Sequence, residues 1–372
     1  AAEQLGYWRI ALADLPAQLD LPLDRPRPAQ QSFRGDRVEF TIGADLHREL
    51  RDLARNRNAT VFMAVHAAFA TLLARLSGST DIAVGTPIAG RTEQATEDII
   101  GMFVNTLVLR LEVDGGASFD ELLSAARETD LQAFAHADVP FERLVEVLNP
   151  ARSTARHPLF QVGFSFQTQN RSELALPGLD IEPIDLEGGT AQFDMHLIVA
   201  DSYGDDGAPQ GIDAILTYAT DLFDRETAEA VAARFEQLLE ALVAVPALPV
   251  GDHALLLPQE RDTVLGAWND TAHGTDPGAT LVGLFDEQVA AHRDDVALVY
   301  EGRRWTYGEF DSSVNRLARH LLGLGVGPED RVALAIRRSP ELLVGMYAIA
   351  KTGAAYVPVD PDQPAERNTY IL

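Results

Sequence analysis

The sequence predicts a mixed α/β protein with two regions of different organisation. Between residues 44 and 245, five strand patterns are interspersed with amphipathic helical patterns, which is typical of helices packed on a sheet. After residue 280, strand and helix patterns alternate as in βαβ units, which favours a parallel sheet with right-handed crossovers. The length of 372 residues allows two or three domains at roughly 150 residues each, so a sizeable core can form.

Composition excludes several classes of site. The formal net charge of -26 disfavours nucleic acid and anionic membranes as partners, because phosphate groups bind lysine and arginine. The chain has no cysteine, which excludes disulfides, thiolate nucleophiles and iron–sulfur clusters and fits a reducing, cytoplasmic compartment. Lys351 is the single lysine, so neither a phosphate-binding loop of the GxxxxGK type nor a second catalytic lysine is present.

The first region begins with amphipathic helical patterns. Residues 1–16 lack the basic-then-apolar order of a signal peptide, and both ends of the chain are expected to be cut from a longer polypeptide. Two further helices are predicted between 44 and 77. The apolar stretch 60–76 is shorter than the roughly 20 residues of a membrane span and contains His66 and Arg75, so it is interpreted as a buried core helix.

Two strands and two helices are expected next. A strand is predicted at 81–90, and the alternating, β-branched stretch 99–113 is expected to be a central strand. One face of that strand would carry Phe103, Asn105, Leu107, Leu109 and Leu111. Ser118 and Glu121 form a capping box that begins a helix, and Pro140 suits the first position of the following helix.

The remaining patterns complete the first region and begin a second one. Strands are predicted at 158–169, 191–201 and 211–220, followed by a helix from about 224 to 245. Residues 246–279 contain four prolines and no sustained period, which indicates a linker. The second region is expected to contain a helix from Thr280, a strand at 296–300, a turn at Gly302, a helix from Thr306, a strand at 331–336, a helix opened by Ser339 and Pro340, and a strand at 354–360.

Five strings resemble the motifs of one enzyme class. In the first region, GMFVNTLVLR at 101–110, HADVPFERLVEVL at 136–148 and RSTARHPLFQVGF at 152–164 resemble the motifs in the C-terminal lobe of condensation domains. In the second region, WTYGEFDSSVNRLARHL at 305–321 and KTGAAYVPVDPDQPAER at 351–367 resemble the first two motifs of adenylation domains. The chain therefore resembles a piece of a nonribosomal peptide synthetase.

The resemblance implies a fold and a division of the chain. Condensation domains resemble chloramphenicol acetyltransferase, so residues 1–245 are expected to form the C-terminal lobe of a condensation domain with this α/β fold. Residues 246–279 would be the linker. Residues 280–372 would be the truncated N-terminal portion of an acyl-adenylate-forming domain, and the ATP-binding loop is expected beyond Leu372.

Catalytic motifs are absent from the 372 residues. Condensation domains carry HHxxxDG in their N-terminal lobe, and none of the nine histidines of this chain neighbours another. His136, His157 and His196 lie in different elements without the spacing of metal ligands or of an acid–base pair, so each is assigned a structural role. No catalytic, cofactor-binding or metal-binding residue is therefore predicted here.

The expected reaction is that of the longer synthetase to which the resemblance assigns this chain. The resemblance implies that an acceptor aminoacyl thioester attacks a donor thioester, both carried on phosphopantetheine by carrier domains of the same synthetase, and that ATP and Mg²⁺ activate the acceptor amino acid. The isolated chain is expected to bind or catalyse little, because it would hold one wall of the site. The alternative is a noncatalytic platform on which lobe and linker dock the adenylation domain.

Three polar residues are candidates for lining a substrate channel. Asn105 shares a strand face with leucines, where a buried amide needs hydrogen-bond partners, so it either ties neighbouring loops or forms a wall of the cleft. Ser165 is predicted on the strand face opposite Val162 and Phe164, either along a polar groove or in solvent. Arg91 follows a turn and would pair with a carboxylate in a surface salt bridge or with a phosphopantetheine phosphate.

Overall fold

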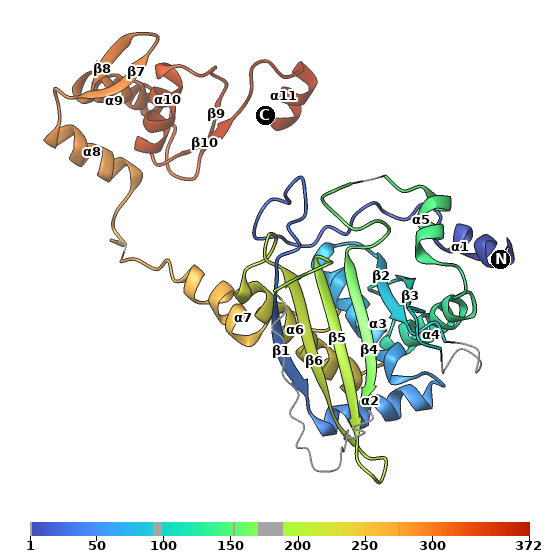
Figure 1. Cartoon of the computed structure of the whole chain (residues 1–372). Coiled ribbons are helices and arrows are strands. Elements are labelled where there is room, and N and C mark those ends of the chain that lie inside the picture. The colour runs from blue at the N-terminus through green and yellow to red at the C-terminus, as the bar shows by residue number, and fades with distance from the viewer. Residues whose placement is uncertain (1, 92–98, 152, 170–188, 275) are drawn as a thin grey trace. The chain divides into compact units, whose positions relative to one another are not determined.

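The chain consists of two compact units. The computed structural model in Figure 1 describes the chain except for residues 1, 92–98, 152, 170–188 and 275. Unit 1 is Ala1–Asn269 and unit 2 is Asp270–Leu372.

Unit 1 contains a six-stranded mixed sheet in the order β1-β6-β5-β4-β2-β3. β2, β4 and β5 are parallel to one another, whereas β1, β3 and β6 pair antiparallel with their neighbours. The strands are β1 (Gly35–Ile42), β2 (Asp81–Ile88), β3 (Asn105–Glu112), β4 (Val162–Gln169), β5 (Met195–Tyr203) and β6 (Pro209–Ala219).

Four helices cover one face of this sheet, behind the strands in Figure 1. They are α2 (Ala44–Asn56), α3 (Val61–Ser77), α4 (Phe119–Ala135) and α6 (Arg225–Ala244). α3 contacts the other three helices and β2, and 12 of its 17 residues are buried, which confirms the predicted core helix. No single described helix is long and apolar enough to cross a membrane, and α2 with α3 meets that test only as a pair bent by 103°.

The predicted helix starts are found with one small shift. Ser118 and Glu121 form the expected capping box of α4, with the Ser118 amide donating to Glu121 Oε2 at 2.8 Å. α5 (Phe141–Leu148) begins one residue later than predicted, because Pro140 is its N-cap residue. α1 (Ala2–Ala11) is joined to the sheet by Arg110, whose Nη1 donates to the carbonyl of Ala11 at 3.0 Å.

One prediction about the strands of unit 1 is wrong, and one strand is missed. β3 is an edge strand, not a central one, and Phe103 precedes it. Its apolar face packs under α4, and Arg110 on the other face pairs with Asp81, so the strand is covered on both faces despite having one neighbour. The edge strand β1 is missed, because charged residues such as Arg37 and Glu39 alternate with its inward apolar residues, as is common at sheet edges.

Unit 2 has two small sheets. β9 (Arg331–Leu334) and β10 (Ala355–Pro358) are parallel and joined by α10 (Pro340–Lys351), which confirms one βαβ unit. β7 (Val296–Tyr300) instead forms an antiparallel hairpin with β8 (Arg303–Thr306), a strand that the sequence pattern does not reveal because it begins with two exposed arginines and has no apolar run. The remaining helices are α8 (Leu281–Ala291), α9 (Tyr307–Gly323) and α11 (Ala365–Ile371).

The stretch between the two regions contains short helices. α7 (Pro258–Leu265) and a 3₁₀ turn at Ala267–Asn269 lie within the segment 246–279. α7 belongs to unit 1 and is tied to α6 by an ion pair between Arg234 and Glu260. Gln237 of α6 also donates to the carbonyls of Ala254 at 3.1 Å and Leu256 at 3.3 Å.

Candidate functional site

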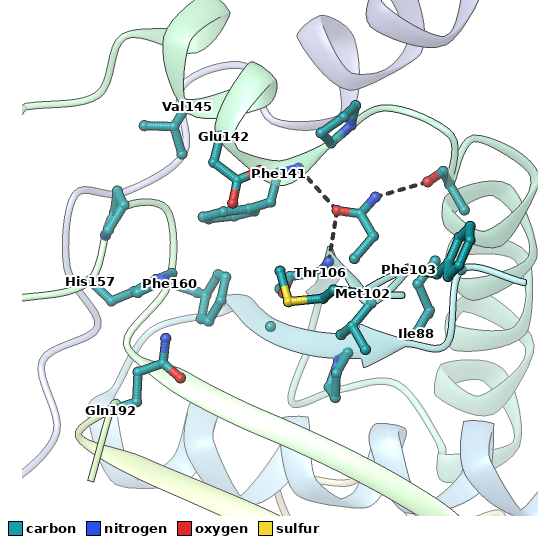
Figure 2. Close-up of a pocket in the computed structure, with 18 of the residues that line it drawn as sticks. Ile88, Met102, Phe103, Thr106, Phe141, Glu142, Val145, His157, Phe160 and Gln192 are labelled. Carbon is teal, nitrogen blue, oxygen red and sulfur yellow. Dashed lines mark hydrogen bonds between the residues drawn. The ribbon is translucent and has the colours of Figure 1, made fainter. Parts of the chain in front are cut away.

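A cavity of about 930 Å³ lies in unit 1 where β2, β3 and the start of α5 meet. Figure 2 shows aromatic side chains such as Phe141, His157 and Phe160 around it. The lining residues are Gly85, Pro87, Ile88, Gly90, Met102, Phe103, Val104, Asn105, Thr106, Ala137, Asp138, Pro140, Phe141, Glu142, Val145, His157, Pro158, Phe160, Gln192, Phe193 and His196.

Asn105 joins three segments at the cavity wall. Its Nδ2 donates to the carbonyls of Ala137 and Val139, both at 2.9 Å. Its Oδ1 accepts from the amides of Thr106 at 2.9 Å and Phe141 at 3.0 Å, bonds that are drawn as dashed lines in Figure 2. The side chain thereby ties the loop after α4 and the first residue of α5 to the start of β3, and it also borders the cavity.

Two strand glycines make room for the cavity floor. A Cβ atom at Gly85 would lie 2.0 Å from Cζ of Phe160, and one at Gly163 would lie 2.7 Å from Cδ2 of His196. Gly85 and Gly163 are partners in the register of β2 and β4. The paired glycines therefore let aromatic rings lie directly on the sheet, which a side chain at either position would prevent.

The aromatic wall is a packed cluster. His157 stacks on Phe141 at 5.4 Å between ring centroids, with 22° between the ring planes, and lies 4.4 Å from Phe160. Phe193 contacts Phe160 at 5.2 Å and His157 at 5.1 Å. Burial lowers the pKa of His157, so its ring is neutral at pH 7 and adds no charge to an apolar wall.

Ser165 is buried and paired with a histidine. It is 7% exposed, so the interpretation of ordinary solvent exposure is wrong. Val162 and Phe164 enter the core on the opposite face, as the alternation predicts. Ser165 Oγ and Nε2 of His196 lie 2.8 Å apart, and burial lowers the pKa of His196 to about 4. Ser165 is not among the described residues that line the cavity and meets it through His196.

Arg91 contacts the ring of Phe103, which lines the cavity. Its guanidinium carbon lies 4.4 Å from the ring centroid of Phe103, which is a cation–π contact. Its Nη2 also donates to the carbonyl of Gly101 at 3.4 Å. Arg91 itself is not among the described lining residues, so it contributes by holding Phe103, which does line the cavity.

The structure brings together residues that the sequence leaves separate. His157, in the loop before β4, and His196, on β5, are interpreted from the sequence as isolated structural histidines, but they line the same cavity. The signal that could have revealed the floor is the pair Gly85 and Gly163, since a glycine inside a strand marks a close approach. Arg152, the first residue of the third motif, lies outside the described residues.

These features define the class of protein. A mixed sheet with helices on one face and a cavity at the end of its strands is the α/β architecture of the chloramphenicol-acetyltransferase-like fold. Residues 1–265 match the condensation domain family, and residues 285–372 match the AMP-binding enzyme family. The chain belongs to the condensation domain family, and its C-terminal part is the beginning of an adenylation domain.

Relatives of this chain are large synthetases. It is 45% identical over 371 residues to a dimodular nonribosomal peptide synthase of Bacillus subtilis (strain 168), covering 100% of this chain and 16% of the relative. It is 40% identical over 369 residues to malpinin synthetase of Mortierella alpina, covering 99% of this chain and 5% of the relative. The chain thus spans a small part of the relatives it matches.

Solved structures agree with this assignment. Holo-AB3403, a four-domain nonribosomal peptide synthetase bound to AMP and glycine, matches 99% of this chain with a TM-score of 0.80 and 27% identity, over 28% of its own length. The X-domain from teicoplanin biosynthesis matches 68% of this chain with a TM-score of 0.65 and 31% identity, over 57% of its own length.

Proposed function

We propose that unit 1 forms one wall of the site where two carrier-bound thioesters condense into a peptide, and that unit 2 begins the domain that activates the acceptor amino acid. The cavity of about 930 Å³ with Asn105 in its wall carries this proposal, because it lies on the segments that match condensation-domain motifs. Its volume suits an aminoacyl group with part of its arm. The proposed division is a condensation lobe at 1–245, a linker at 246–279 and an adenylation start at 280–372.

The chain's own residues would orient the substrate and exclude water. Asn105 fixes the loop after α4 and the start of α5 at the cavity through its hydrogen bonds to Ala137, Val139 and Phe141. The neutral rings of His157 and Phe160 form a dry wall, which favours an uncharged thioester. We assign no catalytic residue to the chain, and its contribution is positioning of the two reacting groups.

Cofactors and partners are assigned to the parent enzyme. It would use ATP, Mg²⁺ and carrier-bound phosphopantetheine, with carrier domains and the rest of the same synthetase as partners in the cytoplasm. Among the described residues there is no cluster of three or more His, Asp or Glu side chains placed to hold a metal. Lys351 is held by Asp286 and Asp311 and is not free for a phosphate, so these residues do not fit a nucleotide site.

The test is Asn105→Ala in an intact synthetase module. It removes the partner of four backbone groups and is expected to lower stability by about 1–3 kcal/mol and to lower the rate of dipeptide formation per folded molecule. Ile42→Val, in the core and away from the cavity, is the control, because it lowers stability by roughly 1 kcal/mol without touching the cavity wall. If both variants keep the parental rate per folded molecule, Asn105 is purely structural and the cavity assignment is wrong.

A second candidate is a noncatalytic platform for the adenylation domain. It is favoured by the attachment of α7 to α6, through the Arg234–Glu260 ion pair and the hydrogen bonds of Gln237. This candidate predicts that Arg234→Gln slows dipeptide formation while Asn105→Ala leaves it unchanged. Amino-acid-dependent pyrophosphate exchange, measured in both variants, shows whether activation itself is intact.

A further inference from the structure

Unit 2 contains a pocket surrounded by arginines. It measures about 670 Å³ and lies between the loop after α8, the strand β8 and the first three turns of α9. The lining residues are Arg293, Asp294, Arg303, Arg304, Trp305, Thr306, Gly308, Glu309, Ser312, Ser313 and Arg316. Four arginines in one pocket contrast with the net charge of -26 of the chain. We call the site lined by these four arginines the arginine pocket.

The pocket is held by fixed backbone contacts. The amide of Gly308 donates to the carbonyl of Arg293 at 2.8 Å, and the amide of Tyr307 donates to the carbonyl of Asp295 at 3.0 Å. A Cβ atom at Gly308 would lie 3.0 Å from Cγ of Arg293, so the glycine lets this arginine pack against α9. Glu309, Ser312, Ser313 and Arg316 follow helical spacing and lie on one face of α9.

The donors available in the pocket are guanidinium groups. The first amides of α9 are already used, since Thr306 Oγ1 accepts from the amide of Glu309 and the amides of Tyr307 and Gly308 bond to the loop. Ser312 and Ser313 donate to carbonyls of their own helix. Among the described residues, Arg293 and Arg304 have no salt bridge or side-chain hydrogen bond. The charge of Arg303 acts on Glu341, and Nη2 of Arg316 donates to Oγ of Ser313 at 3.2 Å.

Two other cations of unit 2 are paired with carboxylates. Arg337 is paired with Asp362, and Lys351 is paired with two aspartates. Asp294 and Glu309 do line the arginine pocket, but Glu309 Oε2 is engaged by the amide of Thr306 at 3.0 Å in a capping box. Four arginines against two carboxylates leave a net positive site.

We propose that the arginine pocket binds a phosphate-bearing small molecule or arm. Guanidinium groups match phosphate oxygens in a bidentate geometry, and several converging arginines suit a group with more than one negative charge. The volume exceeds what an inorganic phosphate fills, so the phosphate would carry an organic portion that extends along Trp305. This site lies outside the cavity of unit 1 and does not depend on the function proposed for it.

The experiment measures binding to the 372-residue chain by isothermal titration calorimetry at low salt. The probes are pyrophosphate, pantetheine 4′-phosphate and pantetheine, the last differing from the second by its missing phosphate. We expect both phosphates to bind, pantetheine not to bind, and affinity to fall as salt rises. Tighter binding of pantetheine 4′-phosphate than of pyrophosphate indicates that the pocket takes a phosphate attached to an organic arm. Tighter binding of pyrophosphate indicates that it takes a free phosphate.

Variants locate the binding. Arg293→Gln with Arg304→Gln is expected to weaken phosphate binding at least about tenfold, since each charged hydrogen bond contributes on that scale. Arg319→Gln is the matched control, because it is an exposed arginine on the same helix outside the pocket lining. Both changes are on exposed side chains, and thermal melts check that each variant folds. Absence of phosphate binding, equal loss in both variants, or tighter binding of a glutamate-rich peptide than of either phosphate would overturn the proposal.

Discussion

The hydroxyl of Ser165 and Nε2 of His196 lie 2.8 Å apart on neighbouring strands, and His196 lines the cavity. The histidine is buried, and desolvation lowers its pKa to about 4. At neutral pH the ring is therefore uncharged and shares a hydrogen bond with a neutral hydroxyl. His196 thereby gives the cavity a polar but uncharged group beside the ring of Phe193.

The lowered pKa of His196 predicts a stability loss in acid. The folded state keeps the ring neutral down to about pH 4, whereas an unfolded histidine takes up a proton near pH 6.5. Between these values the unfolded state binds more protons, so stability falls as pH falls from about 6.5 to about 4, by up to about 3 kcal/mol. Above pH 6.5 the ring is neutral in both states and contributes no pH dependence.

The measurement compares urea unfolding from pH 4 to 7 in the parent chain and in His196→Gln. The variant should lose the part of the acid destabilisation that belongs to His196, so the two curves converge at low pH. His320→Gln, on an exposed ring of α9, is the control and should follow the parent curve. Parallel curves for the parent and His196→Gln would show that burial does not hold this ring neutral.

The close contact of Gly85 with Phe160 predicts a size limit. Gly85→Ala would place a methyl group 2.0 Å from Cζ of Phe160, so the ring must move. We expect a loss of about 1–3 kcal/mol from overpacking, with partial recovery when Phe160→Leu is added. Gly43→Ala is the control, since a Cβ atom there meets nothing within 4 Å. Thermal unfolding of the four chains measures the effect, and equal melting of Gly85→Ala and the parent would contradict the geometry.

Sequence patterns predict the helices of unit 1 well and its sheet less well. α3 is buried on nearly all sides, and α4 begins with the hydrogen bonds of its capping box, because both features depend on residues a few positions apart. The edge position of β3 depends instead on which strands pair, and that is decided by contacts distant in sequence. Because α4 covers one face of β3 and Arg110 the other, this edge strand shows the same alternation of residues as a central strand would.

The cavity shows the same division between local and distant information. Asn105 is recognised because an amide among leucines needs partners, and all four of its hydrogen bonds are present. The aromatic wall is not recognised, since Phe160 and Phe193 come from separate loops and meet through the sheet. The two rings can approach each other because Gly85 and Gly163 have no side chains. The sequence does not show that these glycines are neighbours, since this depends on the register of β2 and β4.

The single lysine predicts a stability element in unit 2. Nζ of Lys351 donates to Asp286 at 2.7 Å, Asp311 at 2.9 Å and Asn315 at 3.0 Å, which joins α8, α9 and α10. Burial alone would lower the pKa of Lys351, but the hydrogen bonds and charges of the two aspartates outweigh it and raise the pKa. The ion pairs therefore stabilise the fold below about pH 10.5, and this contribution is lost as pH rises through the raised pKa.

Lys351→Met is expected to lower the stability of unit 2 by about 1–3 kcal/mol, because Asp311 is left largely buried without its cation. Differential scanning calorimetry at pH 7 measures this change. As the pH rises through the raised pKa of Lys351, the parent and the variant should melt at closer temperatures. Arg338→Gln, an exposed residue of the same unit, is the control. A constant difference between parent and variant across this pH range would contradict the assigned ion pairs.

The buried pair of His66 and Asp130 predicts strong coupling between α3 and α4. Nδ1 of His66 lies 3.0 Å from Oδ1 of Asp130, and both side chains are fully buried. The ring also stacks on Phe164, with 5.9 Å between centroids and 18° between planes. Removing one partner leaves the other polar group unpaired in the core, so Asp130→Leu and His66→Leu should each lower the free energy of unfolding by about 3–5 kcal/mol.

The double variant separates this pairing from ordinary packing. With both polar groups replaced by leucine, no polar atom of the pair remains to be satisfied, so the loss should be well below the sum of the two single losses. Urea unfolding of the four chains gives the coupling energy directly. Glu146→Ala removes an exposed partner of Arg143 and should cost less than about 1 kcal/mol, because solvent screens that pair. Additive losses at His66 and Asp130 would mean that the two residues stabilise their helices independently, and that the 3.0 Å contact contributes no coupling.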